Sequence, residues 1–157
     1  MPIIVFIHGL ESSGRGVKGS FFKNNYPEMI VEDFSGDFDE RMLRLNAILA
    51  LKSDLIIIGS SYGGLMAAVF ACLNFKKVQK LILLAPALNY MPPGIYPEKR
   101  LDIPVYIYHG NQDQVVPHGP VHDIADKIFS NLIWHLVDDD HSLHKTFFNL
   151  NWNLLLS

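Results

Sequence analysis

The sequence has a single cysteine, Cys72, so no disulfide can form within the chain. Cys72 lies in an apolar stretch, which favours a small core residue over a reactive thiol. No apolar run reaches the roughly 18 residues that a membrane span requires, and no signal peptide precedes the first strand-like run. These absences predict a soluble, cytoplasmic globular protein.

Charge is also sparse. Charged residues make up 18% of the sequence, and the formal net charge is -3 with the histidines neutral. A chain without a basic surface is a poor partner for nucleic acid. Apolar residues make up 49% of the 157 residues, which is enough to bury a core. Because no repeat or linker divides the chain, we expect one domain over residues 1–157.

The hydrophobic pattern alternates between two kinds of segment. Short, continuously apolar runs are typical of parallel strands that helices cover on both faces. They lie at 3–7, 29–33, 55–58, 78–84, 105–108 and 132–137. Helix-like segments lie at 17–25, 39–51, 62–74, 121–129 and 142–155. This alternation predicts an α/β fold in three layers, α/β/α, around a mostly parallel six-stranded sheet.

The segment at 86–101 differs from the other connections. It carries four prolines, which break regular helices. It also carries apolar side chains, so it is either a surface loop packed by its own residues or a minimal lid over a substrate pocket. In the second case the candidate pocket residues are Leu88, Met91, Ile95 and Tyr96.

Residues 59–64 read Gly-Ser-Ser-Tyr-Gly-Gly and contain the pattern Gly-x-Ser-x-Gly centred on Ser61. The pattern is short, but a strand-like run precedes it and a helix-like run follows it, which is the setting of a nucleophile elbow. So sharp a turn strains its central residue, and Gly59 and Gly63 leave room for the turn. No Gly-x-Gly-x-x-Gly pattern occurs at this turn, and we expect no cofactor.

Three further segments extend the pattern. The first expected strand ends in Ile7-His8-Gly9-Leu10. The fifth expected strand leads into residues 108–117, which contain Asp113. The sixth is followed by Asp140-His141-Ser142-Leu143. With the elbow, these segments resemble the His-Gly, acid and histidine loops of the α/β-hydrolase superfamily, particularly its small cap-less bacterial serine esterases. The resemblance implies a trimmed six-stranded core that starts at the His-Gly strand, has no cap domain and holds an open pocket.

A serine hydroxyl is a weak nucleophile at neutral pH and needs a base, for which a histidine oriented by a carboxylate serves well. In this fold the chain order is serine, acid, histidine. Ser61, Asp113 and His141 follow that order. The aspartates at 138–140 come too late in the chain, so we interpret them as solvated loop residues or a helix cap.

The chain has seven histidines. His141 is the preferred base because it lies in the loop after a strand, whereas His144 falls in the expected last helix. We expect His8 to make a structural hydrogen bond and His109 to be a satisfied polar residue at a strand end. The other three histidines lie within a strand or beside a helix start: His118, His122 and His135.

The resemblance also implies an oxyanion hole made by the backbone N–H groups of Tyr62 and Leu10. The leading hypothesis is cleavage of a small-molecule carboxylic ester through an acyl-enzyme on Ser61, with no metal and no cofactor. Thioester or amide cleavage by the same triad stays open. So do a non-catalytic binding module on the same fold and a metal-dependent hydrolase that uses the paired histidines, 118 with 122 and 141 with 144. The acyl group and the oligomeric state are not predicted.

Overall fold

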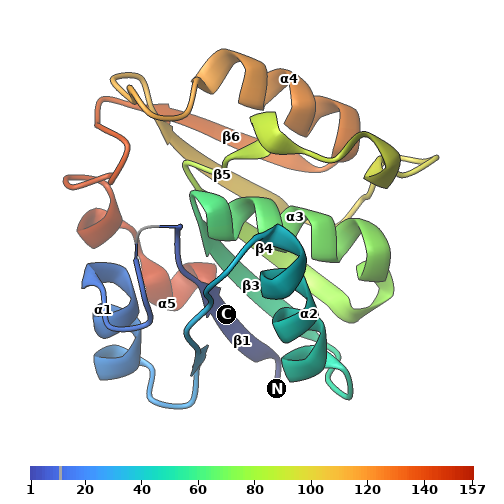
Figure 1. Cartoon of the computed structure of the whole chain (residues 1–157). Coiled ribbons are helices and arrows are strands. Elements are labelled where there is room, and N and C mark those ends of the chain that lie inside the picture. Colours follow the sequence, from blue (N-terminus) through green and yellow to red (C-terminus); the bar gives the residue numbers. More distant parts are fainter. Residues whose placement is uncertain (11) are drawn as a thin grey trace.

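The computed structural model describes residues 1–10 and 12–157. Its centre is a six-stranded sheet in the order β2-β1-β3-β4-β5-β6, and each neighbouring pair is parallel (Figure 1). The strands are β1 (Ile3–Ile7), β2 (Ile30–Val31), β3 (Leu55–Ser60), β4 (Val78–Leu84), β5 (Val105–Gly110) and β6 (Leu132–Val137). The predicted α/β class with a parallel six-stranded sheet is therefore confirmed.

The central strands are buried on both faces, which explains their continuous hydrophobicity. In β3, Leu55 and Ile57 point into one core cluster and Ile56 and Ile58 into the other. This is the period-two alternation of a strand, with apolar partners on each side.

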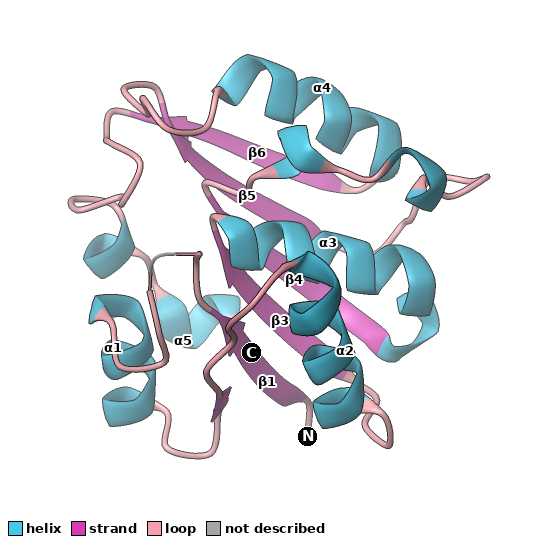
Figure 2. Cartoon of the chain, in the orientation of Figure 1, coloured by secondary structure: helices cyan, strands magenta, loops and turns pink. Residues whose placement is uncertain are grey.

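Helices cover both faces and complete three layers (Figure 2). The helices α2 (Phe38–Leu49), α3 (Tyr62–Asn74) and α4 (His118–Ile128) contribute side chains to one core cluster. The helices α1 (Val17–Asn25) and α5 (Trp152–Leu155) contribute to the other. No helix in the described part of the chain is long and apolar enough to cross a bilayer.

The expected helix at 142–155 is wrong. After β6 the chain forms turns, a 3-10 turn η4 (Phe147–Asn149) and only then the short α5. Leu143 adopts a φ of 53°, which an α-helix does not allow, and the side chain of Asn151 caps the amide of Leu154 to start α5 afresh. The strand expected at 29–33 is likewise reduced to the two residues of β2.

The proline-containing segment at 86–101 contains two 3-10 turns, η2 (Leu88–Tyr90) and η3 (Pro93–Ile95). Leu88 and Met91 are buried in the same core cluster as α3 and α4, and Ile95 packs against that cluster. Tyr96 is exposed. The apolar side chains of this segment therefore attach it to the core.

Candidate active site

Ser61 occupies a sharp turn between β3 and α3, with a φ of 54° and a ψ of -114°. Four backbone hydrogen bonds hold this strained conformation. The amide of Ser61 donates to the carbonyl oxygen of Leu84 at 2.9 Å. The carbonyl oxygen of Ser61 accepts from the amides of Gly64 at 3.0 Å, Leu65 at 3.3 Å and Ala87 at 2.9 Å. The turn is thus bonded to β4 and to the segment after it.

Gly63 makes this elbow possible. A Cβ atom at this position would overlap the carbonyl oxygens of Ile7 and His8, which belong to the backbone and cannot move aside. The first turn of α3 therefore packs directly on the end of β1. This contact brings Ser61 next to the loop that begins at His8.

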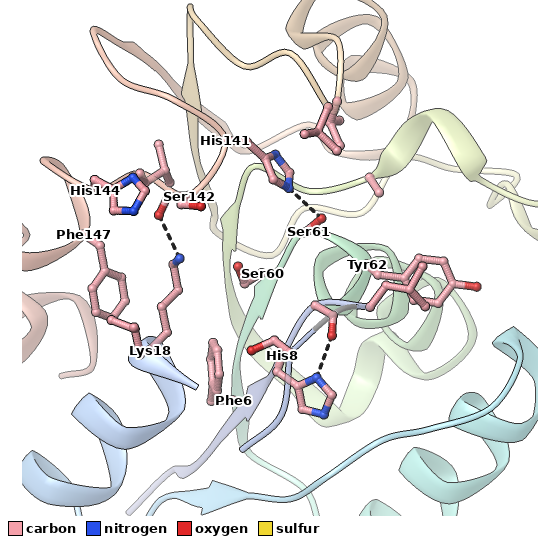
Figure 3. A pocket seen from close by; sticks show the side chains of 18 of the residues that line it. Phe6, His8, Lys18, Ser60, Ser61, Tyr62, His141, Ser142, His144 and Phe147 are labelled. Atoms are coloured by element: carbon pink, nitrogen blue, oxygen red, sulfur yellow. Dashed lines mark hydrogen bonds between the residues drawn. The ribbon is translucent and has the colours of Figure 1, made fainter. Parts of the chain in front are cut away.

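The structure brings Ser61, Asp113 and His141 together. Oγ of Ser61 lies 3.0 Å from Nε2 of His141, and Nδ1 of His141 lies 2.7 Å from Oδ2 of Asp113 (Figure 3 shows the first of these contacts). Because a carboxylate accepts, Nδ1 carries the proton and Nε2 is free to accept from the serine hydroxyl. The three side chains form the hydrogen-bond chain that a Ser-His-Asp triad requires.

The carboxylate of Asp113 is held from several sides. Its Oδ1 accepts from the amides of Val115 and Val116, each at 2.8 Å, and its side chain is fully buried. The ring Nε2 of His109 lies 3.2 Å from Oδ2. These contacts fix the direction in which the carboxylate faces His141.

His109 is fully buried and sits beside the triad without contacting Ser61. Its Nε2–H donates to the carbonyl oxygen of Val116 at 3.0 Å. Burial lowers the pKa of His109 below 6.5, against the opposing effects of the bond to Val116 and of Asp113. His109 is therefore a neutral residue that ties the acid loop together, and its Nδ1 has no partner among the described residues.

His144 lines the same cavity as His141 but pairs with a different carboxylate (Figure 3). Its side chain is 75% exposed, and its Nδ1 is 2.6 Å from Oδ2 of Asp140. No hydrogen bond in the described part of the chain joins His144 to Ser61. The geometry therefore favours His141 over His144 as the base.

Asp139 is a residue whose role the sequence interpretation missed. It is 2% exposed rather than solvated, and its carboxylate accepts from the amides of Asp140, Lys145 and Thr146 at 2.7 to 3.0 Å. Burial alone would raise its pKa, but these bonds outweigh burial and the pKa of Asp139 is lowered. Asp139 folds the loop that presents His141.

The loop after β1 lies against the elbow. Nδ1–H of His8 donates to the carbonyl oxygen of Gly9 at 2.7 Å, and Nε2 accepts from the amide of Phe34 at 2.8 Å. Both ring nitrogens are thereby used, and His8 holds the loop. Leu10 and Tyr62 line the same cavity as Ser61. The amide of Tyr62 is the first of α3 and has no partner within the helix.

A cavity of about 580 Å³ opens over Ser61 and His141. Much of its wall is apolar, with these side chains: Phe6, Leu10, Val17, Tyr90, Val115, Phe147 and Phe148. Lys18 also lines the cavity (Figure 3). The expected pocket residues Leu88, Met91, Ile95 and Tyr96 do not, because the first three pack on the core and Tyr96 lies elsewhere on the surface. Only Ala87 and Tyr90 of that segment reach the cavity.

The paired histidines do not gather into a ligand set. Within residues 1–10 and 12–157, no group of three metal-ligating side chains lies close enough together to hold an ion. His122 packs on the ring of Trp134 with 4.5 Å between centroids. His141 faces Ser61 and Asp113 instead of His144.

Neither a family model nor a curated protein matches the sequence. Solved structures do match, and several of them are hydrolases. Alpha/beta hydrolase domain-containing protein 10 from mouse aligns with a TM-score of 0.73 and 20% identity, over 99% of this chain and 86% of its own. Est1E from Butyrivibrio proteoclasticus with ferulic acid bound aligns at 0.74 and 17%, over 99% and 88%. The Bacillus cereus carboxylesterase aligns at 0.71 and 16%, over 92% and 82%.

These alignments define the class of the molecule: the chain has the α/β-hydrolase fold. The elbow at Ser61 and the loops that carry Asp113 and His141 lie at one edge of its sheet, after the carboxyl ends of β3, β5 and β6. In open α/β sheets this edge is where active sites occur.

Proposed function

We propose that this protein is a serine hydrolase that cleaves a carboxylic ester through an acyl-enzyme on Ser61. The observation that carries the proposal is the continuous hydrogen-bond chain from Ser61 through His141 to buried Asp113. Structural neighbours that include a carboxylesterase support the choice of an ester.

The first half of the reaction forms the acyl-enzyme. Nε2 of His141 takes the hydroxyl proton of Ser61 while Oγ attacks the ester carbonyl carbon. The carbonyl oxygen becomes an oxyanion, which the amides of Tyr62 and Leu10 stabilise. The C–O bond to the alcohol then breaks, and His141 gives its proton to the departing oxygen. Asp113 stabilises the imidazolium that exists between these steps.

The second half repeats the chemistry with water. His141 takes a proton from a water molecule, whose oxygen attacks the acyl carbon on Ser61. The carboxylic acid leaves as the bond to Oγ breaks and the serine regains its proton. A thioester or an amide would react through the same groups, so the acyl-enzyme on Ser61 is common to all three substrate classes.

Two measurements test the proposal. A fluorophosphonate probe should label the folded wild-type protein on Ser61, as seen by intact mass and peptide mapping, and should not label Ser61→Ala. A panel of 4-nitrophenyl esters of increasing acyl length should be hydrolysed by the wild type alone. Lack of labelling in a protein that circular dichroism shows to be folded contradicts catalysis and favours a binding module. If Ser61 is labelled and the protein hydrolyses acyl thioesters but no ester, the substrate is a thioester instead of an ester.

A further inference from the structure

Lys18 brings a positive charge into the cavity that holds Ser61 and His141. It lies in the first turn of α1, and its side chain extends along the cavity wall (Figure 3). Nζ donates a hydrogen bond of 2.8 Å to the carbonyl oxygen of Ser142, the residue that follows His141. In the described part of the chain, no other lysine or arginine lines the cavity.

The ammonium group of Lys18 has unused hydrogen-bonding capacity. It carries three N–H donors, of which the bond to Ser142 uses one. The ring of Phe147 lies on another side, with its centroid 5.5 Å from Nζ. Among residues 1–10 and 12–157, no carboxylate oxygen comes within the 4.0 Å of an ion pair with Lys18. The ammonium group therefore keeps hydrogen-bonding capacity for a ligand in the cavity.

The nearby acidic groups are already engaged. Asp139 accepts backbone hydrogen bonds, and Asp140 pairs with His144. Burial lowers the pKa of Lys18, and the charges of Asp140 and Asp139 oppose that effect. A partly desolvated ammonium group without a close counter-ion gains most from a bound anion, because a charge-assisted hydrogen bond replaces the lost water.

We infer that Lys18 makes the cavity selective for esters that carry a free carboxylate beside the ester group. The inference rests on the proposed function and names its substrate class. A single ammonium group balances one negative charge, which fits a carboxylate better than a doubly charged phosphate beside Asp140. The aromatic and aliphatic wall formed by Phe6, Val17 and Phe148 accommodates the apolar part of such a substrate.

Two matched pairs of esters test this selectivity. In the first pair the charge is on the leaving group, as 4-carboxyphenyl butyrate against 4-carbamoylphenyl butyrate. In the second it is on the acyl group, as the 4-nitrophenyl monoester of adipic acid against the corresponding terminal amide. The readout is the ratio of kcat/KM for the carboxylate to kcat/KM for the carboxamide, which cancels general losses of activity.

The ratio is compared among the wild type, Lys18→Met, Lys18→Arg and Lys23→Met. Lys23 is an exposed lysine on the same helix outside the cavity, so its variant removes an equal charge from α1. For at least one pair we expect the ratio to fall by about tenfold or more in Lys18→Met, since one charge-assisted hydrogen bond is lost. Lys18→Arg should keep most of the ratio, and Lys23→Met should keep the wild-type value. The pair that responds shows whether the charge belongs to the acyl group or the alcohol.

A ratio that is the same in the wild type and Lys18→Met for both pairs overturns the inference, even if all rates fall together. In that outcome Lys18 only supports the histidine loop through Ser142. The two proposals fail separately. If neutral esters are hydrolysed and Ser61 is labelled, an unchanged ratio removes the carboxylate preference alone. If no ester is hydrolysed and Ser61 is not labelled, the proposed function itself is wrong.

Discussion

His109 and His141 approach the same carboxylate oxygen, Oδ2 of Asp113, at 3.2 Å and 2.7 Å. The two histidines differ in burial and in their other hydrogen-bond partners. His109 is fully buried and bonded to the carbonyl oxygen of Val116, whereas the side chain of His141 is 22% exposed and reaches Ser61. Two imidazole rings therefore face one carboxylate, and of these two rings His141 is the one that is hydrogen-bonded to Ser61.

The contrast between His141 and His144 gives the first prediction. His141→Ala should lower kcat/KM for a 4-nitrophenyl ester by several orders of magnitude, because it removes the proposed base for Ser61. His144→Ala should cost less than about tenfold, because its exposed ring pairs with Asp140. Steady-state kinetics on both variants measure the difference. Similar losses in the two variants would leave the base unassigned.

Asp113→Asn should retain the fold and lower kcat by about 10⁴-fold. An amide N–H at this position would donate to Nδ1 of His141, so that Nε2 would carry the proton and could not accept that of Ser61. Asp140→Asn is the matched control, since Asp140 is an aspartate of the histidine loop that bonds His144 instead. Circular dichroism checks the fold and kinetics check the rate. Nearly equal rates for Asp113→Asn and the wild type would mean that another group orients the base.

Gly63→Ala should destabilise the protein by about 1 to 3 kcal/mol or more, because the added Cβ overlaps the backbone oxygens of Ile7 and His8. Gly119→Ala is the control, since a Cβ at that position of α4 meets no atom within 4 Å. It should be neutral or stabilising by up to about 1 kcal/mol. Urea denaturation gives both free energies of unfolding. Equal values for the two variants would contradict the close packing of the elbow on β1.

The sequence predicted those features that depend on residues close together along the chain. Continuous apolar runs predicted parallel strands buried on both faces, and β3 shows both faces in its alternate residues. A strand-like run precedes the Gly-x-Ser-x-Gly pattern and a helix-like run follows it. These two runs predicted that Ser61 lies at an elbow. The structure has both elements, β3 and α3.

Other features depend on contacts between distant segments. Lys18 and Ser142 are 124 residues apart, and no local pattern relates them. An apolar residue has the same chemistry in a core as in a cavity, so Leu88 and Met91 could not be assigned to either. The sequence did not distinguish Asp139 from Asp138 and Asp140. Its carboxylate is buried because a turn brings the amides of Lys145 and Thr146 to it.

The burial of neutral His109 gives the last prediction, which concerns stability and pH. Its pKa is lowered from 6.5 in the folded state, so below about pH 6.5 the unfolded chain binds a proton that the folded protein does not. The free energy of unfolding should therefore fall as the pH drops from 7.5 towards 5, by up to about 1.4 kcal/mol per pH unit from this group. Asp139, Asp140 and Asp33 also have lowered pKa values, but from 3.8, so they contribute at lower pH.

His109→Gln tests this assignment, because a glutamine amide can still donate to the carbonyl oxygen of Val116 without gaining a proton. The variant should lose part of the slope of unfolding free energy against pH between 7.5 and 5, as measured by urea denaturation at each pH. His135→Gln is the control, since His135 is exposed and stacks on Tyr108. It should keep the wild-type slope. A slope that His109→Gln leaves unchanged would mean that other groups carry the acid sensitivity, and that His109 takes up a proton without unfolding the protein.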